Sequence, residues 1–180
     1  MLSLSKAAAV AVNPVFAVGM AACSSSSSSS NASASASSSS SVDYKTTTLS
    51  ADQVQVTGPL DQKPTVTFPF PSQAQALSTK DTIVGKGQAV TATDSVNVNY
   101  VGIGATSGKE FDASWTHGGP ISFPLSGVIE GWQQGMVGMK VGGRRVLVIP
   151  GNLAYGDNPG SSDILPNETL VFVVDLVAIK

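Results

Sequence analysis

Alternating side chains over residues 95–102 constrain the fold of this chain more than any other feature. One face of an extended segment would carry Val96, Val98 and Tyr100, and the other face would carry Asn97, Asn99 and Val101. Because successive side chains of a strand point to opposite sides, the pattern predicts an antiparallel strand with one buried face. A buried face needs a second layer to cover it.

The other predicted elements meet that need. Further strands are expected at 82–84, 109–114, 121–125, 145–150 and 170–179. The one convincing helix of the mature protein starts near Val128, and its apolar face carries Val128, Trp132, Gly135, Met136 and Met139. The sequence therefore predicts an α+β domain, a curved antiparallel sheet of about five strands wrapped around one short helix.

The connection between the last two predicted strands, residues 151–169, shows no strand or helix pattern. Connections of this length in compact domains are usually binding loops or disordered segments. Its apolar residues, among them Leu153, Tyr155, Ile164 and Leu165, favour a packed, functional loop.

The chain divides into four parts. Residues 1–22 have the small, apolar pattern of a secretory signal. Cys23 begins a serine-rich and alanine-rich tether that ends at residue 41 and cannot bury enough apolar surface to fold. Residues 42–79 form an N-terminal extension, and residues 80–180 form the main domain.

The extension carries two short strand candidates, around Val56 and Val66, separated by the turn Gly58–Pro59. Its prolines exclude the centre of a sheet, so we expect edge strands or an arm that lies on the domain. Two alternatives are a partly ordered linker and a segment whose Phe68 and Phe70 extend a substrate surface.

Composition excludes several classes of function. A net charge of −2 with 12% charged residues provides no basic face for nucleic acid. The single cysteine excludes an internal disulfide and a multi-cysteine metal site. The one histidine, His117, is expected in a solvated loop and has no second imidazole nearby, so neither a metal site nor a catalytic triad is expected. Nothing indicates an oligomer, and a monomer is predicted.

Several segments of the last eighty or so residues closely resemble the FKBP-type peptidyl-prolyl cis-trans isomerases, over roughly 84–180. The segments are Val98-Asn99-Tyr100-Val101-Gly102, 109–114, Val128-Ile129-Glu130-Gly131-Trp132, Gly142-Gly143-Arg144-Arg145, Ala154-Tyr155-Gly156 and 170–176. The resemblance implies an apolar pocket that twists the bond before proline, without metal, cofactor or covalent intermediate. It also implies proline-containing polypeptides as partners and macrolides as possible inhibitors.

The resemblance further implies the roles of individual residues. Asp112 matches the acid beside the twisting carbonyl, Tyr155 is expected to offer its hydroxyl to a substrate carbonyl, and the backbone N–H of Ile129 is expected to bind another. Trp132 is the expected floor under the proline ring. The other substrate-binding positions are Tyr100, Phe111, Ile121, Val128, Ile164, Leu165 and Phe172.

Three departures from the family pattern stand out. Ile121 replaces an aromatic residue that often lines the pocket. No arginine occurs in the loop 115–120, where some members pair one with the acid. Only Ser126-Gly127 connects Leu125 to Val128, and this shortening removes an acidic contact near the pocket.

The segment Met20-Ala21-Ala22-Cys23 resembles the lipobox of bacterial lipoproteins, in which the cysteine carries the lipid. We therefore expect an exported isomerase on the extracytoplasmic face of the cell membrane, anchored through Cys23, or a secreted form if the lipobox is not used. Two alternatives to the enzyme are a proline-peptide-binding module or chaperone without significant turnover, and a lipoprotein that serves only surface interaction.

Overall fold

The computed structural model of this protein describes residues 47–180. The predicted signal segment, Cys23, the tether and the first residues of the extension lie outside the described residues. None of the helices within 47–180 is long and apolar enough to cross a bilayer.

The main sheet has six strands, arranged in the order β5-β9-β10-β6, with β7 and β8 both paired to the remaining edge of β6. All pairings are antiparallel. The strands are β5 (Ser78–Ile83), β6 (Ser95–Gly104), β7 (Glu110–Ala113), β8 (Ile121–Pro124), β9 (Arg144–Ile149) and β10 (Leu170–Ile179). The predicted α+β class is confirmed.

One strand starts earlier than its sequence pattern predicted. The pattern placed it at 82–84, whereas β5 begins at Ser78. Ser78 to Asp81 pair with Val148 to Arg145 of β9. These four residues are all polar and lie at the edge of the sheet, so no apolar alternation marks them as a strand.

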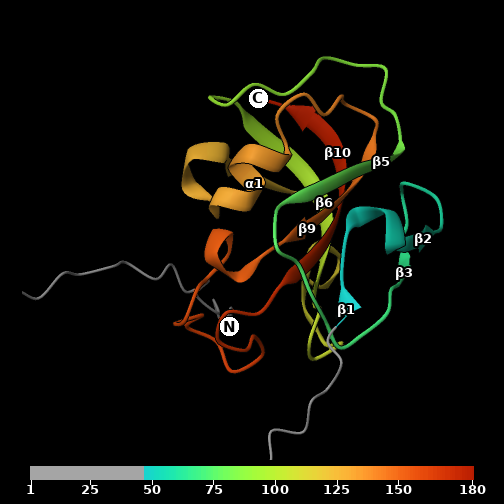
Figure 1. Cartoon of the computed structure of the whole chain (residues 1–180). Coiled ribbons are helices and arrows are strands. Elements are labelled where there is room, and N and C mark those ends of the chain that lie inside the picture. Colours follow the sequence, from blue (N-terminus) through green and yellow to red (C-terminus); the bar gives the residue numbers. More distant parts are fainter. Residues whose placement is uncertain (1–46) are drawn as a thin grey trace, which may run out of the picture. The chain divides into compact units, whose positions relative to one another are not determined.

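Within residues 47–180 one α-helix covers one face of the sheet (Figure 1). This helix, α1 (Glu130–Gly135), is shorter than predicted, because Met136 caps it and Met139 lies in the turn that follows, yet both methionines are fully buried. A Cβ on Gly131 would lie 2.3 Å from Ile149 Cγ2 of β9. Glycine is therefore required there for the helix to approach the sheet this closely.

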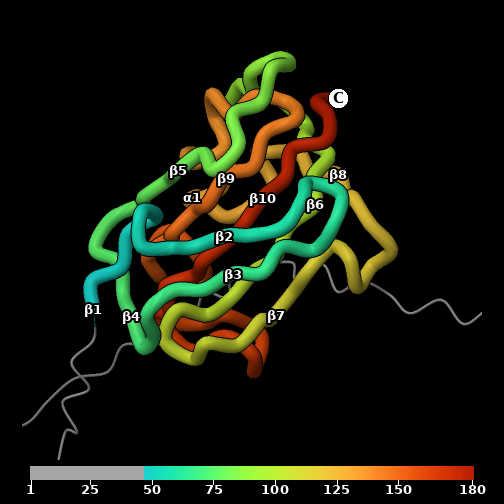
Figure 2. Tube along the Cα trace, turned by 90° about the vertical axis from the view of Figure 1, so that its right-hand side faces the viewer, coloured from blue at the N-terminus to red at the C-terminus, as the bar shows by residue number. Residues whose placement is uncertain are grey.

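The N-terminal extension covers the opposite face (Figure 1, Figure 2). Its elements are β1 (Thr47–Thr48), the 3-10 turn η1 (Ala51–Gln53), β2 (Gln55–Thr57), β3 (Thr65–Thr67) and β4 (Ser72–Gln73). The strands β2 and β3 lie where the alternation indicated strands, but they pair with each other as a separate antiparallel hairpin and not with an edge of the main sheet.

A second apolar core holds the extension on the sheet. Leu49, Val54 and Phe68 of the extension share this core with valines of the two central strands. Those valines are Val146 and Val148 of β9 and Val171 and Val173 of β10. Burial of apolar surface stabilises by roughly 25 cal/mol per Å², so this shared core holds the extension against the sheet.

A buried arginine provides the polar part of the same contact. Arg144 on β9 donates from Nε and Nη2 to the two carboxylate oxygens of Asp175 on β10, at 2.5 and 2.6 Å. Its remaining donors reach the carbonyls of Gly58 and Pro59 in the β2–β3 turn, at 2.7 and 2.8 Å. Burial raises the pKa of Asp175, and the Arg144 guanidinium opposes that shift.

We predict that Asp175→Ala strongly destabilises the protein. The substitution leaves the Arg144 guanidinium buried without its anion, which typically costs about 3–5 kcal/mol. The free energy of unfolding in urea measures the effect. As a matched control, Asp52→Ala removes an exposed pair with Lys80 (3.4 Å) and is expected to change that free energy by less than about 1 kcal/mol. Equal effects of the two substitutions would contradict the prediction.

Candidate active site

Aromatic rings from the strands β6, β7 and β10 and from the helix α1 meet on the helix-covered face of the sheet. Trp132 of α1 is at the centre, and its ring centroid lies 5.3 Å from Phe172 and 5.7 Å from Tyr100. The ring centroids of Phe111 and Phe172 are 5.5 Å apart. These three pairs are T-shaped, with interplanar angles between 85° and 89°. Edge-to-face contacts of this kind stabilise a cluster by about 0.5–1.5 kcal/mol each beyond area burial.

A glycine under this cluster makes the packing possible. Gly102 of β6 lies between Tyr100 and the end of the strand, and a Cβ there would be 2.5 Å from Phe111 Cζ and 2.9 Å from Phe172 Cε1. Contacts this short do not occur between carbon atoms, so only glycine permits both rings to lie against the strand.

Apolar side chains of intermediate burial border the cluster. Ile121, Val128 and Ile129 are all packed against the apolar core to which Tyr100, Trp132 and Phe172 belong. Ile129 is the N-cap of α1, and its carbonyl accepts from the amides of Trp132 and Gln133. The amide of Ile129 itself donates to no acceptor within residues 47–180, as is typical of the first N–H groups of a helix.

The long loop predicted to be functional supplies the rest of the border. Ile164 is buried in the core, whereas Tyr155 is 43% exposed and Leu165 is 44% exposed. The Tyr155 hydroxyl has no hydrogen-bond partner among the described residues. Both exposed side chains are therefore available to a ligand.

A buried carboxylate fixes this loop. Glu168 accepts from the amide of Leu165 at 2.8 Å through Oε2. Through Oε1 it accepts from the amides of Thr106 and Ser107 in the β6–β7 turn, at 3.2 and 2.8 Å. The first bond closes a turn within the loop and the other two join the loop to the β6–β7 turn, which explains an ordered course in a segment with no regular pattern.

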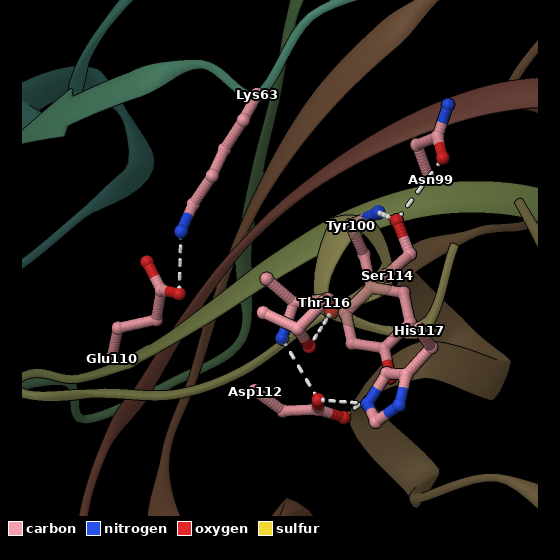
Figure 3. A network of polar contacts seen from close by, with 9 residues as sticks. Lys63, Asn99, Tyr100, Glu110, Asp112, Ser114, Thr116 and His117 are labelled. Carbon is pink, nitrogen blue, oxygen red and sulfur yellow. Dashed lines mark hydrogen bonds and ion pairs between the residues drawn. The ribbon is translucent and has the colours of Figure 1, made fainter. Parts of the chain in front are cut away.

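Asp112 of β7 is the one acid at the cluster, and its carboxylate is held from two sides (Figure 3). Tyr100 donates its hydroxyl to Oδ2 at 2.5 Å. His117 Nε2 lies 2.8 Å from Oδ1, and the amide of Ala113 donates to the same oxygen at 2.8 Å. The side chain of Asp112 is 35% exposed.

The histidine reaches Asp112 because the edge of the sheet is interrupted there. β8 pairs with Ser95 to Val98 of β6, and β7 pairs from Val101 onward, so neither reaches Tyr100. The amide of Tyr100 donates instead to Ser114 Oγ at 3.1 Å, and Ser114 Oγ donates to Asn99 Oδ1 at 3.0 Å. The turn that leaves the sheet here, η2 (Ser114–His117), carries His117.

The surroundings of Asp112 keep both neighbouring phenols protonated. Burial, the hydrogen bond to Asp112 and its negative charge raise the pKa of Tyr100 far above the usual value. Partial burial and the charge of Asp112 also raise the pKa of Tyr155. Each hydroxyl is therefore a hydrogen-bond donor at neutral pH.

Comparison with known proteins identifies the family. Residues 86–177 match the family described as FKBP-type peptidyl-prolyl cis-trans isomerase. The chain is 50% identical to the FK506-binding protein of Streptomyces anulatus over 121 residues. This alignment covers 66% of this chain and 98% of that protein. This chain belongs to the FKBP-type peptidyl-prolyl cis-trans isomerases. It is therefore an enzyme of the class that the sequence predicted.

Other relatives agree. The FKBP-type peptidyl-prolyl cis-trans isomerase FkpA of Escherichia coli K12 is 52% identical over 96 residues, which cover 53% of this chain and 35% of that protein. The crystal structure of FkpA aligns with a TM-score of 0.54 at 49% identity, over 58% of this chain and 48% of that one. The crystal structure of AtFKBP13 aligns with a TM-score of 0.53 at 34% identity, over 60% of this chain and 96% of that one.

The FKBP fold brings the predicted site residues of the main domain to one cluster and its border. The residues are Tyr100, Phe111, Asp112, Ile121, Val128, Ile129, Trp132, Tyr155, Ile164 and Phe172. The remaining predicted residue, Leu165, is exposed next to Ile164 in the loop. Cys23 lies outside the described residues. Within residues 47–180, no group of histidine, cysteine and acidic side chains could hold a metal ion.

Sequence reasoning missed two residues of this isomerase. The ring centroid of Phe123 lies 6.0 Å from that of Trp132 and 5.9 Å from that of Tyr100. Its spacing of two from Ile121 on one strand was the signal that could have found it. His117 is exposed as expected, but it bonds Asp112, and only the three-dimensional course of the loop reveals that contact.

The alternative in which Phe68 and Phe70 extend the substrate surface is wrong. Phe68 belongs to the core on the opposite face of the sheet. With Phe70, Ile103 and Gly108, it lines a hollow of about 110 Å³ there. Phe68 is thus part of the contact between the extension and the isomerase domain.

We predict that Gly102→Ala damages the aromatic cluster. The new methyl group forces Phe111 and Phe172 apart, and overpacking of this kind costs about 1–3 kcal/mol of stability. Urea unfolding measures the cost, and the isomerase rate is expected to fall with it. Gly127→Ala, whose Cβ meets only Pro124 Cγ at 3.4 Å, is the control and is expected to be nearly neutral. A neutral Gly102→Ala would contradict the close contact.

Proposed function

We propose that this isomerase accelerates X-Pro rotation by holding the bond against the aromatic cluster, away from water. Rotation must break amide resonance, with a barrier of about 18–20 kcal/mol. The planar amide is more polar than the twisted one, so apolar surroundings favour the transition state over the ground state. The observation that carries the proposal is the set of edge-to-face contacts around Trp132, which presents a rigid floor for the proline ring.

Two donors at the border of the cluster are proposed to hold the substrate. The unpaired amide of Ile129 binds one substrate carbonyl. The hydroxyl of Tyr155, kept protonated by its surroundings, binds the other. Fixing both carbonyls favours the twisted geometry, because the interactions are strongest when the bond has rotated.

Asp112 is proposed to act through its charge. In the twisted amide the nitrogen no longer donates electrons to the carbonyl, so the carbonyl carbon becomes more electrophilic. A fixed carboxylate beside it then stabilises the transition state more than the ground state. No proton is transferred in this reaction. Tyr100 and His117, which bind the two oxygens of Asp112, hold the charge in place.

The partners proposed are proline-containing polypeptides, with the protein acting as a monomer. A macrolide inhibitor is also expected to occupy the cluster, since the Streptomyces relative is named an FK506-binding protein. Such a ligand would bury apolar surface against the same rings and exclude the substrate. Inhibition by FK506 therefore reports whether catalysis takes place at this cluster.

We predict that Tyr155→Phe lowers kcat/KM for an X-Pro peptide about fivefold. The change removes one hydrogen bond to the substrate, worth about 1 kcal/mol, and leaves the ring in place. The rate is measured as cis-to-trans relaxation of a short peptide without a coupled protease, with and without FK506. Thermal unfolding of the variant serves as the control for folding.

The same experiment separates the enzyme from a binding module. A catalytic cluster loses turnover in Tyr155→Phe while the affinity for a proline peptide changes less. A peptide-binding module or chaperone shows no acceleration above the uncatalysed rate, in a wild type that is folded. That result would overturn the proposed function.

We also propose that the isomerase is exported and anchored to the extracytoplasmic face of the membrane through Cys23. The support is the apolar segment before Cys23, the Met20-Ala21-Ala22-Cys23 sequence and the serine-rich tether after it. Proline isomerisation takes tens to hundreds of seconds without a catalyst, which is slow enough to limit the folding of exported proteins.

We predict that Cys23→Ser releases the protein from the membrane. In a bacterial host, the wild type is expected to partition into the detergent phase of Triton X-114 and to incorporate labelled palmitate. The variant is expected in the aqueous phase without label. A wild-type protein found unlabelled in the medium would show that the segment is an ordinary cleaved signal.

A further inference from the structure

Three consecutive residues fix the course of the long loop beside the aromatic cluster. The loop, residues 151–169, carries Tyr155 and Leu165, whose exposed side chains are available to a ligand. It ends in Asn167-Glu168-Thr169, which we call the anchor. The loop, the β6–β7 turn and β4 of the extension lie at the same end of the main sheet (Figure 2). The anchor is therefore placed to connect all three.

The first two anchor residues hold the two arms of the loop. The amide of Asn167 donates to the carbonyl of Gly156 at 2.8 Å, next to Tyr155. Glu168 is buried, and its amide donates to the carbonyl of Leu165 at 3.1 Å. In return, Glu168 Oε2 accepts from the amide of Leu165 at 2.8 Å. Both arms of the loop are thus bonded to the anchor.

Further hydrogen bonds join the anchor to the rest of the molecule. Glu168 Oε1 accepts from the amides of Thr106 and Ser107 in the β6–β7 turn. Thr169 is buried, and its Oγ1 accepts from the amide of Ala74, directly after β4, at 2.9 Å. A buried donor that loses its acceptor is left with the full cost of its desolvation. The β6–β7 turn and the extension therefore hold the anchor in one position.

We infer that Glu168 is a positioning residue that keeps Tyr155 and the Ile164–Leu165 arm in place for the substrate, and that the extension supports it through Thr169. The inference rests on the proposed function, in which this loop contacts the substrate. The carboxylate of Glu168 bonds three backbone amides, so it acts through the loop. A loop that is ordered before binding loses less entropy when substrate binds. The extension thereby contributes to substrate affinity from the other face of the sheet.

Loss of the anchor bonds is expected to weaken binding more than turnover. Glu168→Gln keeps the shape of the side chain but only one acceptor oxygen. With that oxygen at the amides of Thr106 and Ser107, the new NH2 group faces the amide of Leu165, and two donors oppose each other. The arm is then ordered only when substrate binds. We expect KM to rise about 3- to 10-fold and kcat to change less than about 2-fold.

The test measures kcat, KM and the Kd of FK506 in four full-length proteins. They are the wild type, Glu168→Gln, Thr169→Val and Val54→Ala. Exchange NMR over a range of X-Pro peptide concentrations separates kcat from KM, and titration calorimetry gives the Kd of FK506. Urea unfolding checks that every protein is folded under the assay conditions.

The last two variants separate the anchor from general stability. Thr169→Val replaces the hydroxyl that accepts from Ala74 by a methyl group, and KM is expected to rise about 2- to 5-fold. Val54→Ala removes apolar surface from the second core and none of the anchor bonds. It is therefore expected to lower stability and to leave KM and the Kd of FK506 as in the wild type.

Support requires a higher KM and a higher Kd of FK506 in Glu168→Gln and in Thr169→Val, with both values unchanged in Val54→Ala. Unchanged values in a folded Glu168→Gln, or an equal rise in Val54→Ala, overturn the positioning role. Unchanged values in Thr169→Val overturn the part of the extension, and they decide against the whole inference if Glu168→Gln does not fold.

Failure of the proposed function has a different signature. A folded wild type that does not accelerate rotation overturns the proposed function, and the Kd values of FK506 then decide the positioning role on their own. A folded wild type with neither activity nor affinity for FK506 overturns both.

Discussion

The fold depends on two central strands that are apolar on both faces. Leu147 and Ile149 of β9 point to the helix-covered core, and Val146 and Val148 point to the other. A sheet of this kind cannot leave either face in water, so it needs a cover on each side. The helix provides one cover, and the N-terminal extension provides the second. The extension is therefore a structural layer of this isomerase, and the Arg144–Asp175 pair joins its turn to the sheet.

The two covered faces of the sheet differ in the residues that they hold. The extension side holds the second apolar core and the Arg144–Asp175 pair, whereas the helix side holds the aromatic cluster that is proposed to bind substrate. The aromatic cluster is built on strands and a helix, with only Tyr155, Ile164 and Leu165 supplied by a loop, and Glu168 ties that loop to the β6–β7 turn. A site on rigid elements loses little entropy when substrate binds, which favours catalysis by geometry alone.

Periodicity was enough to predict most strands of the sheet and the apolar face of the helix, and the family resemblance supplied the residues of the cluster except Phe123. The strand at 95–102 and the helical face around Trp132 are strong patterns, because they follow the burial of one face. The start of β5 at Ser78 escaped prediction because an exposed edge strand has no apolar alternation. The docking of the β2–β3 hairpin on a face of the main sheet escaped because it depends on which distant segments meet, and local sequence does not encode that. The His117–Asp112 contact joins residues five apart, and it escaped because it depends on the course of the chain after β7.

The polar groups of the proposed site are few, and this has a consequence for how such an enzyme can vary. In the proposed mechanism the apolar cluster favours the twisted amide, and its packing tolerates little change because Gly102 lies under two rings. The same mechanism has Asp112 act through its field, so its effect depends on where the carboxylate is held. Of its two partners, Tyr100 is itself part of the aromatic cluster, whereas His117 lies in the exposed turn η2. A substitution at His117 therefore changes the surroundings of the carboxylate and leaves the rings of the cluster in place.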